Sequence, residues 1–219
     1  MHKGSPLAVR ANSRLAVIPR NGVRLSARIS LPSGQPPFPC VVFVHGLGSS
    51  KDSPRNTVIA EHLLDAGLAT LLFDLSGHGE SSADPSGDGQ AYVNDLAAAC
   101  EWARRRPEIA ADRIGVAGSS LGAVIALDAA RGGRIRPAAL VLRAPPVGEG
   151  DLDGFDVPAL VLIGSLDPLL AQVRAAARGR GVMLRVVEGA GHLFEEPGTL
   201  RQALEQTVSW FKERLVALG

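Results

Sequence analysis

The stretch that decides the fold is Ile114-Gly-Val-Ala-Gly-Ser-Ser120-Leu-Gly122. An apolar run leads into the pattern G-x-S-x-G, and an Ala-rich segment follows it as far as Arg131. A strand before this pattern and a helix after it predict a sharp turn that projects the central serine from the backbone. The alternative is an ordinary Gly/Ser turn, because so short a pattern also occurs by chance. The flanking strand and helix favour Ser120 as a nucleophile, with Ser119 supporting the turn.

Short apolar runs on both sides of this turn predict the rest of a sheet. They are rich in Val, Leu and Ile, and most of them lack an alternation of polar and apolar residues. This pattern is typical of parallel strands that are buried on both faces. The predicted strands cover residues 41–44, 68–73, 114–117, 138–142, 159–163 and 182–187.

Helical patterns lie between these runs. Ser53-Pro54 is typical of a helix start, with Pro at the first helical position, and predicts a helix that runs to about Asp65. Apolar spacing predicts further helices along residues 93–103, 121–131, 169–178 and 204–215. Upstream, residues 15–18 and 23–31 predict two strands around a turn at Asn21-Gly22. We therefore expect an α/β fold, with a mostly parallel central sheet, flanking helices and a preceding hairpin.

Length and composition limit the classes of protein that fit this sequence. The 219 residues suit one domain, 1–219, of which 1–13 are expected to form a loosely ordered N-terminal segment. A formal net charge of +1 gives no electrostatic reason to expect nucleic-acid or membrane binding. No apolar run approaches the ~20 residues needed to span a bilayer. The first residues lack the apolar core of a signal peptide, so the expected location is cytoplasmic.

The two cysteines do not suggest a metal site or a disulfide. Cys40 opens an apolar strand and Cys100 lies on an apolar helix face, so both are expected to be small buried hydrophobic residues. The sequence contains no Cys/His spacing that is typical of structural zinc. We expect no metal and no cofactor.

A second candidate catalytic residue follows the last predicted strand. Ligands of parallel α/β sheets bind beyond the carboxyl ends of the strands, so residues at those ends are informative. A serine hydroxyl needs a base, and His192 lies in the loop Gly189-Ala-Gly-His192 at this edge. A solvent-exposed or locally hydrogen-bonded histidine is the alternative. His192 is favoured because a histidine comes last in the chain order of Ser-Asp-His triads on this kind of sheet.

The third triad candidate is Asp167, which follows the strand 159–163 in Gly164-Ser-Leu-Asp167-Pro168. A carboxylate fixes the tautomer of the base and stabilises its protonated form. The alternative is that Asp167 caps a helix that starts at Pro168, and both roles are compatible.

The loop His45-Gly-Leu47-Gly48 follows another strand, where it would contribute to an oxyanion hole. The N–H groups of Leu47 and Leu121 are the expected donors. A phosphate-binding loop is disfavoured, because neither the P-loop spacing nor a complete G-x-G-x-x-G is present. The loop from Asp74 to Ser81 is expected to be structural, with Asp74 and His78 bonding to nearby backbone, rather than to contact substrate or metal.

Three further residues are predicted to bind substrate: Gly46, Arg143 and Pro146. Arg143 and Pro146 follow a strand that ends at the catalytic edge and are expected to line the acyl side of the pocket. For Arg143 two interpretations stay open, which are recognition of a substrate carboxylate and a structural ion pair.

Taken together, these motifs resemble the α/β hydrolases, and within them the dienelactone-hydrolase-like group. The resemblance covers nearly the whole chain and depends on residues 45–56, 74–81, 118–122, 164–167 and 189–197. It implies hydrolysis of an ester or related acyl bond through an acyl-enzyme. Dienelactone hydrolases proper use a cysteine nucleophile where this chain has Ser120, which favours a general carboxylesterase.

Residues 143–158, between two predicted strands, are too few and too polar for the cap or lid that many α/β hydrolases insert there. An open site is therefore expected, suited to small or short-chain esters. Thioester, lactone, peptide-type amide and perhydrolytic chemistry on the same triad are the nearest alternatives. A non-catalytic ligand-binding module is a more remote one. We expect a small-molecule substrate and a monomer or homodimer.

Overall fold

The computed structural model describes residues 12–84, 89–154, 156–178 and 181–216. Most of the predicted N-terminal segment, residues 1–11, lies outside this range. The last residue of that segment, Ser13, is ordered in the first strand and pairs with Ser30. The edge strand thus begins two residues before the predicted start at residue 15.

The centre of the protein is an eight-stranded sheet with the strand order β1-β2-β4-β3-β5-β6-β7-β8. In the N-terminal hairpin β1 pairs antiparallel with β2, and β2 also pairs antiparallel with β4. All the other neighbouring strands are parallel. The predicted hairpin and the mostly parallel sheet are thus confirmed. The strands are β1 (Ser13–Arg20), β2 (Val23–Ser30), β3 (Phe38–Val44), β4 (Ala69–Phe73), β5 (Ile109–Ser119), β6 (Ala139–Arg143), β7 (Ala159–Gly164) and β8 (Val182–Val187).

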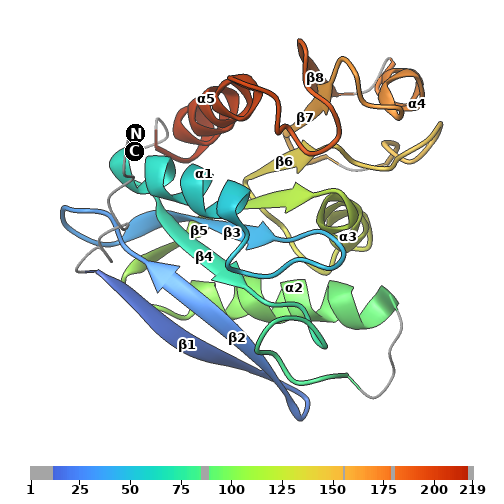
Figure 1. Ribbon diagram of the computed structural model, residues 1–219. Helices are drawn as coiled ribbons and strands as arrows, with labels where there is room; N and C mark the ends of the chain where they lie inside the picture. The colour runs from blue at the N-terminus through green and yellow to red at the C-terminus, as the bar shows by residue number, and fades with distance from the viewer. Residues whose placement is uncertain (1–11, 85–88, 155, 179–180, 217–219) are drawn as a thin grey trace, which may run out of the picture.

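Helices cover both faces of this sheet (Figure 1). α1 and α5 pack side by side on one face, and α2 and α3 pack together on the other. The helices are α1 (Pro54–Asp65), α2 (Gly89–Arg104), α3 (Leu121–Arg131), α4 (Leu170–Ala176) and α5 (Thr199–Phe211), and α5 continues into a π-helical turn, Lys212–Val216. No helix in the described part of the chain is long and apolar enough to cross a membrane.

Burial explains why the sequence pattern locates the strands so well. Every residue of β3, β4, β6 and β7 is buried, as expected for parallel strands between two helical layers. The last strand, β8, alternates between exposed and partly buried residues because it is an edge strand. Helix α4 starts at Leu170, one residue after the predicted start at residue 169.

The connection from β6 to β7 is short and forms no helix over residues 144–154 and 156–158, the part that the structure describes. The expected absence of a cap or lid is therefore confirmed for this connection. The carboxyl ends of the parallel strands carry the loops that bring the candidate catalytic residues together.

Candidate active site

Ser120 occupies the sharp turn between β5 and α3. Its backbone has φ 51° and ψ −119°, in the left-handed half of conformational space that a residue with a side chain rarely adopts. Its N–H donates to the carbonyl oxygen of Arg143 on the neighbouring strand at 2.8 Å. The turn therefore holds the serine in a strained conformation at the end of the sheet, as the G-x-S-x-G context predicts.

The glycines on either side of the turn permit a close approach of the backbone. A Cβ atom on Gly118 would lie 2.4 Å from the carbonyl oxygen of Gly122, and one on Gly122 would lie 2.3 Å from that of Val44. Both distances are well below van der Waals contact. The pattern thus places α3 directly against β5 and against the end of β3, which leads into the His45 loop.

The imidazole of His192 lies beside the serine. His192 Nε2 is 3.2 Å from Ser120 Oγ, and His192 Nδ1 is 2.8 Å from Asp167 Oδ2. The His192 side chain is 31% exposed, whereas the Asp167 side chain is fully buried. With the Nδ1 proton facing the carboxylate, Nε2 is free to accept the proton of the serine hydroxyl.

Asp167 faces the imidazole, as the triad interpretation predicts, whereas the predicted helix start at Pro168 is not observed, because the N-cap residue of α4 is Leu169. The Asp167 Oδ2 atom faces His192, and its Oδ1 atom accepts the N–H of Leu169 at 2.9 Å, just before α4. This second bond fixes the rotation of the carboxylate.

The two N–H groups expected to form an oxyanion hole are positioned by the ends of β3 and α3. Leu121 is the first residue of α3, where an N–H has no partner within the helix. In the described parts of the chain, neither the Leu47 nor the Leu121 N–H donates to another protein group. Leu47 is 76% exposed, so most of this residue is in contact with solvent.

His45 links the Leu47 loop to the neighbouring loop after β4. Its Nδ1–H donates to the carbonyl oxygen of Gly46 at 2.8 Å, and its Nε2 accepts the N–H of Leu75 at 3.1 Å. This pattern requires a neutral imidazole. Burial lowers the pKa of His45, and the nearby His78 acts in the same direction. His45 thus holds the loop as an uncharged bridge.

A buried ion-pair cluster that the sequence analysis missed supports the same two loops. Lys51 Nζ lies 2.9 Å from Asp74 Oδ2 and 2.6 Å from Glu80 Oε2. Asp74 also accepts the backbone N–H groups of Lys51 and Glu80. The expectation that Asp74 and His78 bond to nearby backbone is confirmed, since His78 Nδ1 contacts the carbonyl oxygen of Ser76. A lysine in a Gly/Ser-rich loop gives no sequence signal that it is buried.

The three residues predicted to bind substrate lie at different depths. Gly46 lies against the serine turn, where a Cβ atom would be 3.2 Å from the Ser119 carbonyl oxygen. Arg143 is buried at the end of β6, and Pro146 is exposed three residues further on. Arg143 thus lies directly beside the serine turn, whereas Pro146 is at the rim.

The chemistry that this arrangement favours is nucleophilic attack by a serine. Both cysteines are buried, and burial raises the pKa of the Cys100 thiol to about 12, so neither is a reactive thiolate. Among the described residues there is no cluster of three or more His, Cys, Asp or Glu residues that could hold a metal ion.

The sequence matches a known enzyme family. Residues 35–154, more than half of the chain, match the family described as serine aminopeptidase S33. The matched region contains the His45 loop and Ser120 and ends before Asp167 and His192. The last two strands and α5 thus lie outside the matched region.

A curated relative and two solved structures are also similar. Over 203 residues the chain is 35% identical to a Mycobacterium tuberculosis protein provisionally named a phosphoribosyl transferase, covering 90% of this chain and 45% of that protein. The chain thus spans less than half the length of this relative. Dienelactone hydrolase from Anabaena variabilis superposes with a TM-score of 0.80 at 29% identity, covering 93% of this chain and 98% of that one. Est1E from Butyrivibrio proteoclasticus, solved with bound ferulic acid, has a TM-score of 0.79 at 21% identity, covering 91% and 98%.

Proposed function

Because the chain belongs to the α/β-hydrolase family described as serine aminopeptidase S33, we propose that it is a serine hydrolase that cleaves carboxylic esters through an acyl-enzyme intermediate. The fold and family make it a hydrolase that is similar to dienelactone hydrolase. The serine nucleophile, the ester reaction and the preference for small substrates are the proposal. One observation carries it, namely the continuous hydrogen-bonded chain from buried Asp167 through His192 to Ser120.

The proposed reaction has two steps. Ser120 Oγ attacks the ester carbonyl carbon while its proton passes to His192 Nε2, and the N–H groups of Leu47 and Leu121 stabilise the negatively charged oxygen. The carbon–oxygen bond to the alcohol then breaks, and the protonated His192 gives its proton to the leaving oxygen. Water attacks the acyl carbon and loses a proton to His192. The bond from that carbon to Ser120 Oγ then breaks, His192 returns the proton to Oγ, and the acid is released.

The remaining expectations belong to this proposal. The enzyme would act in the cytoplasm, as a monomer or homodimer, on a small ester and without a cofactor. The short β6–β7 connection supports a small substrate, because it supplies no apolar cover for a long acyl chain. Gly46 and Pro146 would contact the substrate from the inner wall and the rim of the site.

A substrate panel tests the reaction class. An ester, a thioester, a lactone and an amide with matched acyl groups would be compared by kcat/KM in the wild type and in Ser120→Ala. We expect the ester to be hydrolysed fastest and all Ser120-dependent activity to disappear in the variant. Faster hydrolysis of the thioester, lactone or amide would move the protein to that class on the same residues.

A further inference from the structure

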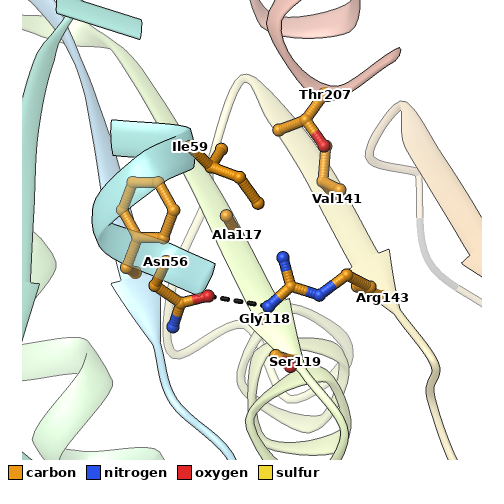
Figure 2. A pocket seen from close by; sticks show the side chains of 9 residues that line it. Asn56, Ile59, Ala117, Gly118, Ser119, Val141, Arg143 and Thr207 are labelled. Carbon is orange, nitrogen blue, oxygen red and sulfur yellow. Dashed lines mark hydrogen bonds between the residues drawn. The ribbon is translucent and has the colours of Figure 1, made fainter. Parts of the chain in front are cut away.

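A buried arginine without a carboxylate partner lies beside Ser120. Arg143 is 7% exposed, and its Nη2 atom donates to Asn56 Oδ1 at 2.7 Å (Figure 2). Among the described residues, no carboxylate lies within ion-pair distance of Arg143. Buried Lys51 and largely covered Arg20 differ, because each pairs with at least two carboxylates. The structural ion pair that the sequence allowed for Arg143 is therefore not formed in the described chain.

The guanidinium keeps its charge at this site. Burial lowers the pKa of Arg143 to about 10, and the positive charge of Arg55 acts in the same direction, so the group stays protonated at neutral pH. A buried charge that is paired only with a neutral amide costs folding free energy. Arg55 itself is paired with Glu195, in the loop that follows His192, at 3.0 Å.

The guanidinium of Arg143 projects into a small cavity under α1 and α5. Figure 2 shows Asn56 and Ile59 of α1 and Thr207 of α5 around it, with Gly118 and Ser119 at the end of β5. Ser119 is the register partner of Arg143 across β5 and β6, and the next residue is Ser120. The cavity is small and partly open, so any group that reaches the guanidinium must do so through its open side.

We propose that Arg143 binds a carboxylate of the substrate, so that the ester hydrolysed by this protein carries a negative charge. This inference rests on the proposed serine-hydrolase function. A guanidinium presents five N–H donors in a rigid fork that matches a carboxylate, and the bond to Asn56 uses only one of them. Asn56 fixes the orientation of the fork, and the substrate anion supplies the missing counter-charge.

Two pairs of esters test the charge preference on each side of the scissile bond. In the acyl pair, p-nitrophenyl valerate is compared with mono-p-nitrophenyl glutarate, in which a carboxylate replaces the terminal methyl group. In the alcohol pair, phenyl acetate is compared with p-carboxyphenyl acetate. After subtraction of spontaneous hydrolysis, the ratio of kcat/KM for the charged ester over the neutral ester is measured. We expect a ratio above about 10 in at least one pair, because charge-assisted bonds are strong.

Two variants locate this preference at the buried arginine. In Arg143→Gln the ratio should fall by about 10- to 100-fold. Arg143→Lys keeps the charge but loses the forked donor geometry, so its ratio should lie between those of the wild type and Arg143→Gln. The matched control is Arg185→Gln, at an exposed arginine of β8, and it should keep the wild-type ratio. If Arg143→Gln does not fold, inhibition of wild-type valerate hydrolysis by glutarate but not by neutral glutaramide tests the same charge.

The possible results separate this inference from the proposed function. If the wild type hydrolyses neutral esters but prefers neither charged ester, or if Arg143→Gln keeps the preference, Arg143 does not recognise a carboxylate and the serine-hydrolase function still stands. If no ester is hydrolysed and a fluorophosphonate does not label Ser120, the proposed function fails and the inference fails with it.

Discussion

His192 Nε2 lies 3.2 Å from Ser120 Oγ, although the two residues are 72 positions apart in the chain. Their contact depends on β6 and β7, which separate the serine strand β5 from β8 in the sheet. Asp167, at the end of β7, completes the arrangement from the far side of the imidazole. Each of the three residues comes from a different strand end, so the geometry is a property of the whole sheet.

Asp167→Asn should lower kcat by about 10⁴-fold. The Asp167 Oδ1 atom accepts the Leu169 N–H, so an asparagine would keep its oxygen there and turn its NH₂ group toward His192 Nδ1. The imidazole would then carry its proton on Nε2, where it cannot accept the serine proton. Steady-state hydrolysis of p-nitrophenyl acetate measures the effect. Asp151→Asn, in the β6–β7 connection, is the control, and near-wild-type activity in Asp167→Asn would exclude Asp167 as the orienting acid.

Lys51→Met should destabilise the fold by about 3–5 kcal/mol. The substitution leaves the fully buried carboxylate of Asp74 without its cation, while Glu80 at the edge of the cluster can turn toward water. The free energy of unfolding in urea gives the measurement. As a contrast, Arg105→Met removes an exposed pair with Glu101 and should cost under about 0.5 kcal/mol. Equal losses in the two variants would show that the Lys51 cluster is not a structural support.

His45 should make the protein less stable in weak acid. Because burial lowers its folded-state pKa below the ordinary 6.5, the unfolded chain binds a proton first as the pH falls. The stability that neutral His45 contributes is therefore present above pH 6.5 and is lost as the pH falls from there toward the lowered pKa. His45→Gln removes this dependence. Its stability deficit relative to the wild type should be largest at about pH 8 and shrink toward about pH 5 in urea unfolding. A constant deficit would contradict the assignment.

Acyl-chain preference should follow from the short connection between β6 and β7. The β6–β7 connection forms no helix in its described residues, so long acyl chains would find little apolar surface to bury. Across p-nitrophenyl esters from acetate to palmitate, kcat/KM should be highest for the short chains. A preference for palmitate would mean that another part of the molecule covers the site.

The sequence predicts well where the strands lie and which strand ends carry the candidate catalytic residues. The apolar runs locate the parallel strands because strands buried on both faces are mostly apolar, and the G-x-S-x-G turn locates Ser120 between β5 and α3. The strand-end positions of Asp167 and His192 were predictable for the same reason, since the carboxyl ends of neighbouring parallel strands meet at one edge.

The polar contacts beneath the site were not predictable in the same way. Lys51 lies in a Gly/Ser-rich loop and pairs with carboxylates of another loop, and no periodic pattern marks such a pair. Arg55 and Glu195 are 140 positions apart and meet only because α1 and the His192 loop share one edge of the sheet. For Arg143, the sequence left both recognition of a carboxylate and a structural ion pair open. In the described chain no carboxylate pairs with Arg143, and this observation motivates the proposal that a substrate carboxylate binds there.

The most direct test of the central claim is active-site labelling with a fluorophosphonate, followed by peptide mapping, in the wild type and in Ser120→Ala. We expect a label on Ser120 in the wild type and no label in the variant. Ester turnover should fall in parallel by about 10⁴- to 10⁶-fold. A folded wild-type protein that takes up no label, or takes it up equally in the variant, would contradict the assignment of Ser120 as nucleophile and favour a ligand-binding module on a hydrolase fold.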